Sequence, residues 1–549
     1  MPAPVLLIIA SIVFIAAYIW YGSFLNRTFD IRADKETPAH TNADGVDYVP
    51  ARTPVLMGHH FSSIAGAGPI LGPIFAAVFG WVPVFLWILV GSVFVGGVHD
   101  YASLVASIRH EGRSIGEVIE LHIGKTGKRL FLIFAWFALV LIIAVFCKVV
   151  ASTFINTPAA ATSSGLFIVL AVVFGFGIYR LKFPLGLSTL VGVILLAGCV
   201  ALGVRFPPHL GGTVSIAVLQ AHVSLSSLWI IILLAYVFVA AVTPVWVLLQ
   251  PRDFLNSFLL YFILLAGLLG IFVSGPKMDL PAFTEFNTDL GPLFPLLFVT
   301  VACGAISGFH SLVASGTSSK QLDRETDARP VGYGSMLIEG LLAVVALITA
   351  ITVVHQNSGQ FFQAVSEKGP ITVFSNGIGQ FVSVLGIPVN LGITFASLAI
   401  SAFCLTTLDT ATRLARFIFQ EFFEKDNKKS ILSNRYAGTL ITVVFSALLA
   451  FSGTSSTLWP VFGSANQLLA AIALLAITVW LAELGKKTLF VAIPMVIMFI
   501  ITLTALGSLI VKNMKGGFAT LSIFSILLFG VTLVLIIQAF QHFLRMKKT

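Results

Sequence analysis

Long apolar segments alternate with short polar ones along nearly the whole chain. Fifteen of these segments have roughly the 17–25 residues that a helix needs to cross a bilayer. They lie at about 4–21, 54–79, 81–109, 129–154, 163–179, 186–204, 228–249, 253–274, 291–316, 333–354, 387–412, 435–452, 459–483, 488–511 and 519–543. The pattern therefore predicts an all-α polytopic membrane protein with about 15 transmembrane helices.

Lysine and arginine are divided unequally between the two sets of alternate loops. One set holds 26 of the 32 basic side chains and the other holds five, while Lys148 alone lies inside an apolar segment. Because basic loops stay in the cytoplasm, this bias predicts an external N-terminus and a cytoplasmic C-terminus. The first apolar segment has no basic flank and no cleavage-site pattern, which predicts a retained helix instead of a signal peptide.

Composition supports the membrane assignment and argues against other classes of protein. Of the residues, 57% are hydrophobic and 10% are charged, whereas soluble proteins have about 25% charged residues. The mean hydropathy is +1.00. The net charge of +9 is spread over loops and is not gathered into an aromatic-rich patch, so we expect no nucleic-acid partner. Since no loop is long enough for a soluble domain, residues 1–549 should form a single integral membrane domain.

Two apolar segments contain glycines, prolines and polar residues that disfavour a continuous helix. They read 58-GHHFSSIAGAGPILGP-73 and 303-CGAISGFHSLVASGTSSKQ-321. Non-helical backbone is tolerated at membrane depth only where protein buries it or water reaches it, so both segments should be broken helices that line a cavity. A Gly/Pro-rich helix end packed against its neighbours is the alternative.

The charge bias gives the two interrupted segments opposite directions across the membrane. Such a pair indicates inverted repeats with a transport site between them. We number the fifteen predicted helices in chain order. The expected repeats then cover 54–204, with helices 2–6, and 291–483, with helices 9–13. Helices 7 and 8 lie between them in 205–290, and 484–549 should form peripheral C-terminal helices.

Polar and ionisable side chains within the apolar segments are candidates for function, because they are costly in hydrocarbon. The expected substrate-binding residues are His59, His60, Ser62, Ser63, Gly66, Lys148, His310, Ser311, Asn466 and Gln467. The expected ion- or proton-coupling residues are His99, Asp100, His310, Thr406, Thr407 and Asp409. Interhelical hydrogen bonds and ordinary ion pairs are the alternative roles for these groups. Glu339 lies near a predicted helix end, which favours a structural role.

Several of these side chains could in principle converge on a metal ion, since histidine binds metals as well as protons. The candidates are His59, His60, His99 and Asp100. They have neither the i, i+4 histidine pair of metalloproteases nor the Cys/His spacing of zinc sites. We therefore expect no bound metal and no other cofactor.

Five long motifs extend over these segments: 58-GHHFSSIAGAGPILGP-73 with 96-GGVHDY-101; 244-PVWVLLQPRDFLNSF-258; 303-CGAISGFHSLVASGTSSKQ-321 with 332-GYGSMLIEG-340; 408-LDTATRLAR-416; and 459-WPVFGSANQLLAA-471. In these motifs the chain resembles the carbon starvation protein A (CstA) family of bacterial inner-membrane transporters. The resemblance implies a leucine-transporter-type (APC-like) fold. It also implies a secondary transporter that takes up peptides or pyruvate during carbon limitation, coupled to protons.

These observations together suggest alternating access, in which a small carboxylate-bearing nutrient binds between the two interruptions. Free backbone N–H groups at the helix ends would attract its carboxylate. A sodium-coupled amino acid or peptide symporter is one alternative, with Thr406 or Thr407 at the ion site. A passive channel is another, and a metal-dependent intramembrane enzyme is the alternative from a different class. Because no nucleophile–base motif supports an enzyme, we expect none. The expected partners are the small-molecule substrate and the lipid bilayer.

Overall fold

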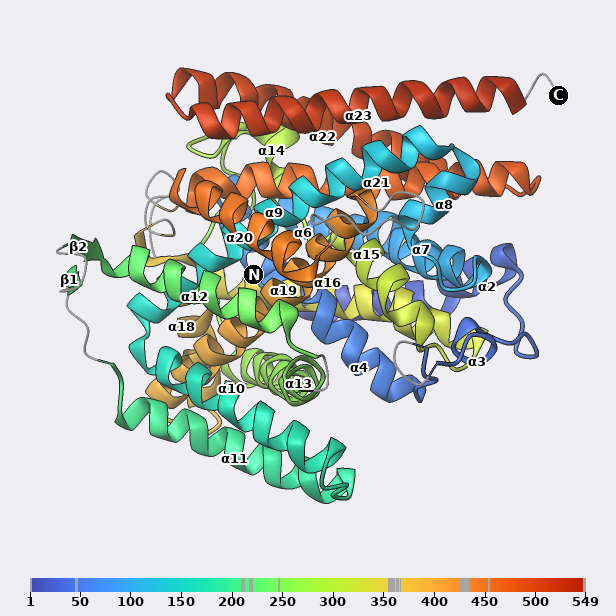
Figure 1. Ribbon diagram of the computed structural model, residues 1–549. Coiled ribbons are helices and arrows are strands. Elements are labelled where there is room, and N and C mark those ends of the chain that lie inside the picture. The colour runs from blue at the N-terminus through green and yellow to red at the C-terminus, as the bar shows by residue number, and fades with distance from the viewer. Residues whose placement is uncertain are drawn as a thin grey trace.

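The computed structural model describes residues 2–44, 48–208, 213–216, 221–244, 247–353, 361, 365, 367–423, 434–452 and 455–546. Almost all of these residues are helical (Figure 1). The helices in the first half of the chain are α1 (Ala3–Ala16), α2 (Gly22–Phe29), α3 (Pro38–Thr41), α4 (Thr53–Ile64), α5 (Gly68–Ala76), α6 (Trp81–Val90), α7 (Gly97–Arg109), α8 (Ile115–His122), α9 (Lys125–Asn156), α10 (Pro158–Tyr179), α11 (Leu185–Arg205), α12 (Leu225–Val242) and α13 (Leu249–Ser274).

The second half of the chain is built in the same way. Its helices are α14 (Leu293–Thr300), α15 (Gly308–Gly316), α16 (Ser335–Val353), α18 (Pro370–Ser383), α19 (Val389–Phe423), α20 (Arg435–Ser452), α21 (Ser455–Glu483), α22 (Leu489–Lys515) and α23 (Ala519–Met546). Strands β1 (Thr213–Ile216) and β2 (Ala221–Ser224) form one antiparallel pair, and β3 (Asn287–Thr288) and β4 (Gly291–Pro292) form another. Both pairs lie in connections between helices.

Thirteen helical spans among the described residues are long and apolar enough to cross a membrane, or fourteen if α4 and α5 count as one bent span. Together they correspond to fourteen of the fifteen predicted segments. The exception is 291–316, which forms α14 and α15 with the non-helical stretch 301–307 between them. The prediction of about 15 spanning helices is therefore one too high by length, because the polar interruption leaves two halves that are each too short.

The two predicted interruptions are real breaks in the backbone. Between α4 and α5 the chain leaves the helix at residues 65–67 and bends by 46°. Between α14 and α15 it is non-helical at 301–307. Both breaks are buried, so the protein itself must satisfy the backbone groups that the breaks set free.

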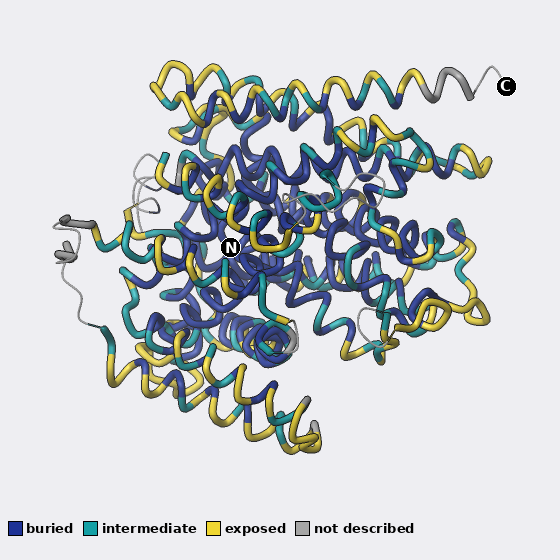
Figure 2. The backbone as a smooth tube through the Cα atoms, viewed as in Figure 1, coloured by how far each residue is buried: buried dark blue, intermediate teal, exposed yellow. Residues whose placement is uncertain are grey.

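The centre of the molecule is formed by α9 and α19, which make the most extensive helix pair among the described residues. The broken helices, α7, α16 and α21 complete this centre, where most of the chain is buried (Figure 2). The α10–α11 hairpin and the α22–α23 pair lie at opposite edges of the view. Aliphatic side chains such as Leu187 and Ile194 on α11, and Ile523 and Ile537 on α23, are more than half exposed, as expected for surfaces that face lipid.

One helix was not anticipated from the sequence. The segment between the tenth and eleventh predicted spans contains α18, which has 14 residues and is too short to cross a membrane. Its apolar face, including Ile371, Phe374 and Ile378, is buried against α5, α13, α16 and α19. The apolar-segment criterion misses such a helix because its hydrophobic residues form only one face.

Candidate functional site

The two breaks touch each other at a position where only glycine fits. A Cβ atom added at Gly68, in the first turn of α5, would lie 2.2 Å from Cys303 Sγ in the second break. Real Cβ atoms do not come that close to a neighbour. At the other end of the first break, a Cβ at Gly66 would lie 2.5 Å from Thr407 Oγ1 on α19. The glycines therefore allow α5, the second break and α19 to meet in one place.

Side chains of α21 satisfy the backbone of the second broken helix. Asn466 Oδ1 accepts a hydrogen bond from the backbone N–H of Phe309 at 3.0 Å, and Asn466 Nδ2 donates to Ser307 Oγ at 3.0 Å. Gln467 Nε2 donates to the carbonyl of Phe298 at 2.8 Å. We expected Asn466 and Gln467 to bind substrate. In the structure, each side chain forms a hydrogen bond with the protein backbone.

A buried ionisable cluster connects α7, α15 and α16. Asp100 Oδ2 lies 2.7 Å from His310 Nδ1, and Asp100 Oδ1 lies 2.7 Å from His99 Nδ1. On its other side, His310 Nε2 lies 3.4 Å from Glu339 Oε2. All four side chains are fully buried. No lysine or arginine forms an ion pair with them in the described part of the chain, so the charge of the cluster depends on how many protons it holds.

Glu339 has a more central place than the sequence indicated. The predicted helix begins near residue 333, which puts Glu339 close to its end. In the structure the helical path extends back through a π-helical stretch at Arg329–Gly334, and the span covers Glu325–Thr352. Glu339 therefore lies near the middle of the span and beside His310.

A second buried polar cluster connects α12, α13 and α19. Arg252 Nη1 pairs with Asp409 Oδ2 at 2.6 Å and also donates to Tyr236 Oη, which itself donates to Asp409 Oδ2 at 3.0 Å. Arg252 Nη2 and Asn256 Nδ2 each donate to Thr406 Oγ1 at 3.2 Å. Asp409 and Thr406, both expected to couple an ion, are thus held by a buried guanidinium.

Sequence reasoning did not find Arg252 or Tyr236. Arg252 was counted as a cytoplasmic loop residue because it stands at the start of an apolar segment. The available signal was its place in the PRDFLNSF motif, where Pro251 is typical of the first turn of a helix and brings the arginine inside. In the structure, Arg252 lies in the first turn of α13 and is fully buried.

The adjacent histidines of α4 have different surroundings. His60 is buried and lies with its Nδ1 2.7 Å from Ser318 Oγ, beyond the end of α15. His59 is partly exposed and lines a cavity of about 350 Å³ with residues of α10 and α13. The two histidines therefore face different surroundings, and among the described residues neither forms a hydrogen bond with Asp100.

The serines that follow the histidines bond to the backbone. Ser63 Oγ donates to the carbonyl of His59 at 2.8 Å, and Ser62 Oγ donates to the carbonyl of Asp253 at 3.4 Å. On α15, Ser311 Oγ donates to the carbonyl of Gly308 at 2.7 Å. These three hydroxyls are thus engaged with backbone carbonyls. Among the described residues, no group of three or more His, Cys, Asp or Glu side chains could hold a metal ion.

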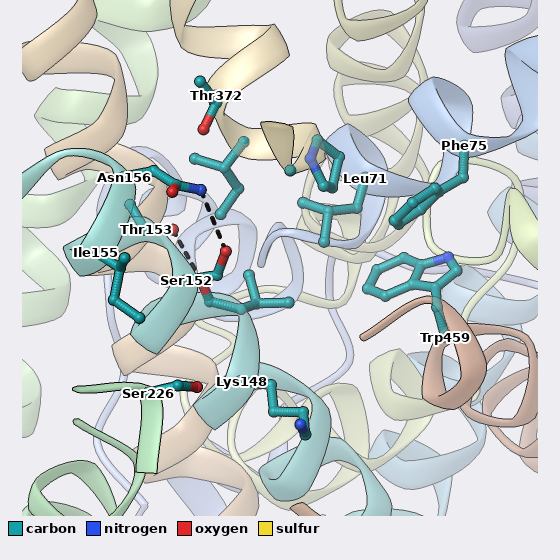
Figure 3. A pocket seen from close by; sticks show the side chains of 14 residues that line it. Leu71, Phe75, Lys148, Ser152, Thr153, Ile155, Asn156, Ser226, Thr372 and Trp459 are labelled. Atoms are coloured by element: carbon teal, nitrogen blue, oxygen red, sulfur yellow. Dashed lines mark hydrogen bonds between the residues drawn. The ribbon is translucent and has the colours of Figure 1, made fainter. Parts of the chain in front are cut away.

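Lys148 lines a separate cavity of about 370 Å³ (Figure 3). The walls come from α5, α9, α21, the start of α12 and the start of α18. Lys148, Ser152 and Asn156 of α9 lie along one side, and Leu71, Phe75 and Trp459 lie across from them. A volume of this size is within the usual range of small-molecule sites.

A series of aromatic contacts connects this cavity with the first break. Phe75 packs against Trp459 at 6.0 Å between ring centroids, and Trp459 packs against Phe462 at 5.0 Å. Phe462 contacts Phe146 at 5.7 Å, and the ring of Phe146 would be 3.7 Å from a Cβ at Gly66. These rings form a continuous series of contacts between the cavity and the place where the broken helix meets α19.

The arrangement of the helices is similar to that of a solved membrane transporter. The manganese transporter of Eremococcus coleocola matches with a TM-score of 0.53 and 13% sequence identity, over 92% of this chain and 99% of that chain. At this level of identity the likeness concerns the fold alone. Together with the apolar spans, it defines the class as a multi-pass membrane protein with a transporter-like fold.

Sequence comparison identifies the family. The carbon starvation protein CstA family matches residues 2–363 and 354–505. The peptide transporter CstA of Bacillus subtilis is 33% identical and aligns over 99% of this chain and 98% of its own length. The pyruvate/proton symporter BtsT of Escherichia coli is 31% identical, over 91% of this chain and 81% of its own. The chain belongs to the carbon starvation protein CstA family.

Membership confirms the resemblance noted in the sequence motifs. The relatives are named as transporters, which supports a transporter and sets the intramembrane enzyme aside. Their names also differ in substrate, since one is a peptide transporter and the other a symporter of pyruvate and protons.

Proposed function

We propose that this protein is a proton-coupled secondary transporter that imports small carboxylate-bearing nutrients, peptides or pyruvate, across the bacterial inner membrane. It would serve during carbon starvation, with its N-terminus outside and its C-terminus in the cytoplasm. The names of its relatives support this substrate range, and one of them is a proton symporter. The basic residues of alternate loops support the orientation.

The observation that carries the proposal is the position of His310 between Asp100 and Glu339. His310 belongs to α15, which is half of a broken helix, whereas the two carboxylates belong to α7 and α16. A change in the number of protons on this cluster changes the attraction between α15 and its neighbours. The gain or loss of one proton would thereby favour one position of the broken helix over another.

Alternating access in this proposal uses two inverted repeats that each begin with a broken helix. Two helices that are equivalent under a two-fold axis contact each other where they lie close to that axis. In the structure α9 packs against α19, and α12 packs against α20. These pairs support a first repeat of α4–α9 with α12 and α13, and a second repeat of α14–α16 with α19–α21. The α10–α11 hairpin would then be an insertion, whereas the sequence pattern placed it in the first repeat at 54–204.

Sodium coupling is the second candidate, and one observation favours it. Thr407 Oγ1 has no hydrogen-bond partner among the described residues and lies beside the first break, where backbone carbonyls could act as further ligands. However, Arg252 donates to the neighbouring Thr406 at 3.2 Å. A cation bound at Thr406 would be repelled by this guanidinium, although Asp409 offsets part of its charge. The buried guanidinium therefore disfavours a sodium site at Thr406.

Proteoliposomes with imposed gradients test the proposal. We expect an acidic exterior in sodium-free buffer to drive uphill accumulation of pyruvate or alanyl-alanine, and a protonophore to abolish it. Asp100→Asn and His310→Ala should lose this accumulation, while Asp289→Asn, at an exposed carboxylate, should keep it. Full accumulation by Asp100→Asn, His310→Ala and Asp409→Asn alike would contradict the assignment. Accumulation that requires sodium and ignores pH would favour the second candidate, and downhill equilibration alone would indicate a channel.

A further inference from the structure

The cavity beside Lys148 has a polar side with a specific arrangement of donors. Lys148, Ser152 and Asn156 are four residues apart on α9, so they lie on one face of the helix. Asn156 Nδ2 donates to Ser152 Oγ at 3.4 Å and to the carbonyl of Lys368 at 3.1 Å, which uses both of its amide hydrogens. Ser152 accepts in the first of these bonds and keeps its own hydrogen to donate.

Within the described part of the chain, the donors left free on this face are thus the Lys148 ammonium and the Ser152 hydroxyl. Thr153 contributes no donor, because its hydroxyl already donates to the carbonyl of Val149 at 2.8 Å. A carboxylate has two oxygens that can accept from two neighbouring donors, and bonds to charged groups are the stronger ones. One helical turn separates Lys148 from Ser152 on the same face, and the flexible lysine side chain can turn its ammonium toward a carboxylate held at Ser152.

The opposite side of the cavity is apolar. Leu71 and Phe75 of α5 face the α9 residues across the space, together with the indole ring of Trp459 (Figure 3). The polar atom of this ring is already used, since Trp459 Nε1 donates to the carbonyl of Thr300 at 3.2 Å. A ligand that fits both sides therefore has a carboxylate at one end and a short apolar body at the other.

The charge of the cavity distinguishes two kinds of carboxylate ligand. Lys148 is the only charged residue on its wall in the described part of the chain, and no carboxylate lines it. The free ammonium of an amino acid or peptide would find no counter-charge there and would be repelled by Lys148. A monoanion, such as a short 2-oxo acid, brings only the charge that the cavity can pair.

We propose that Lys148 and Ser152 form a carboxylate-binding site that selects small monoanions over zwitterionic peptides and amino acids. The proposal rests on the transport function proposed above and specifies the substrate class of that transporter. It makes Lys148 a specificity-determining residue, and it predicts that masking the ammonium of a peptide improves its binding.

The experiment measures uptake of labelled pyruvate in proteoliposomes with an acidic exterior, for the unaltered protein and for Lys148→Met, Lys148→Arg and Ser152→Ala. We expect Lys148→Met to raise the half-saturating pyruvate concentration at least about tenfold and Ser152→Ala to raise it severalfold. Lys148→Arg should retain most of the affinity. The matched control is Lys515→Met, which removes an exposed lysine at the end of α22 and should change nothing.

Competition against the unaltered protein tests selectivity without any variant, so it is decisive even if Lys148→Met fails to fold. Alanyl-alanine and N-acetyl-alanyl-alanine have the same peptide core, but only the first has a free ammonium. We expect the acetylated form to inhibit pyruvate uptake at a concentration at least about tenfold lower. Equal or better inhibition by the free dipeptide would overturn the proposal, as would unchanged pyruvate affinity in folded Lys148→Met.

The two proposals fail in different ways. If the unaltered protein accumulates no pyruvate but accumulates free dipeptides in response to the proton gradient, the carboxylate site is wrong while the transport function stands. If it accumulates neither substrate under any gradient, the transport function itself is contradicted.

Discussion

His310 Nδ1 on α15 and Asp100 Oδ2 on α7 lie 2.7 Å apart in a region with no solvent exposure. His99 Nδ1 contacts the other oxygen of the same carboxylate at 2.7 Å. Asp100 therefore links the second broken helix to α7 through one carboxylate. Any movement of α15 away from α7 must break this contact, and the energetic cost depends on the charge of both groups.

Replacing Asp100 should separate transport from its driving force. Asp100→Asn keeps the size of the side chain and its ability to accept at one oxygen, but it removes the negative charge. We expect substrate counterflow, which needs only binding and movement, to stay within about threefold of the original rate. Accumulation driven by a pH gradient should fall at least about tenfold. The two assays on the same proteoliposomes provide the measurement, and an equal loss in both would indicate a structural role.

The contact between Gly68 and Cys303 should tolerate no side chain at the glycine. Gly68→Ala would place a Cβ 2.2 Å from Cys303 Sγ and 2.5 Å from Cys303 Cβ, so the two breaks would have to separate. Overpacking of this kind typically costs about 1–3 kcal/mol. We expect a lower thermal unfolding temperature in detergent for Gly68→Ala.

A double variant that adds Cys303→Gly to Gly68→Ala provides the control for this clash. It removes both clashing atoms and should recover part of the stability of Gly68→Ala. Cys303→Ala keeps the Cβ and should recover less. If Gly68→Ala had the same stability alone, with Cys303→Gly and with Cys303→Ala, the close approach of the two breaks would be wrong.

Asn466 should stabilise the second break mainly through its acceptor oxygen. Asn466→Ala removes the partner of the Phe309 N–H, and an unpaired buried donor costs about 1–3 kcal/mol. Asn466→Leu should cost at least as much, because it fills the space without restoring the acceptor. Stability is measured by thermal unfolding, with Thr504→Val on the exposed side of α22 as a control that should have little effect. A pure substrate ligand would instead lower affinity without lowering stability.

Arg252 should be essential for the polar contacts that join α13 to α12 and α19. Arg252→Met leaves Asp409 buried without its guanidinium, and breaking a buried pair from one side typically costs about 3–5 kcal/mol. The double substitution Arg252→Met with Asp409→Leu removes this pair and should recover part of that loss, while Asp253, 3.8 Å from Arg252, keeps its buried carboxyl. Thermal unfolding of the single and double variants checks this. A double variant less stable than either single one would show that the two residues do not act as a pair.

A histidine pair just beyond the end of α7 should make stability depend on pH. His110 Nδ1 lies 2.6 Å from the carbonyl of Ala106 and so carries a hydrogen, which leaves Nε2 of the neutral ring as an acceptor. His122 Nε2 lies 2.9 Å from that acceptor and donates to it, while His122 Nδ1 contacts Glu483. Burial lowers the pKa of His110 below its ordinary value of 6.5.

The sign of the effect follows from this lowered pKa. The folded protein favours neutral His110, so the stability from this contact is complete above about pH 6.5 and declines as the pH falls below it. Each unit by which the pKa is lowered corresponds to about 1.4 kcal/mol. We expect the unfolding temperature to drop between about pH 6.5 and pH 5, and His110→Gln to reduce this drop. The control is His40→Gln, at a more exposed histidine that pairs with Asp323 at 2.9 Å, and it should not reduce the drop.

The candidate site was only partly predictable from the sequence. Asp100 and His310 were recognisable because each is an ionisable residue in an apolar segment, but nothing in the order of residues showed that they share a hydrogen bond. The role of Glu339 was underestimated because the span begins at Glu325, before the apolar segment that the sequence pattern marks. Arg252 was assigned to a loop, since a charged residue at the edge of an apolar run has no local sign of burial.

By itself the sequence determined that the protein lies in the membrane, which parts of the chain form nearly all of its spans, and where two of them break. These properties follow from local composition, because transfer into hydrocarbon and helix formation depend on the residues within one segment. Only the tertiary structure decided that Gly68 meets Cys303, that Asp100 meets His310 and that Lys148 faces a cavity with no carboxylate among its described lining residues. The first two of these contacts join residues more than two hundred positions apart. They depend on how whole helices pack against each other.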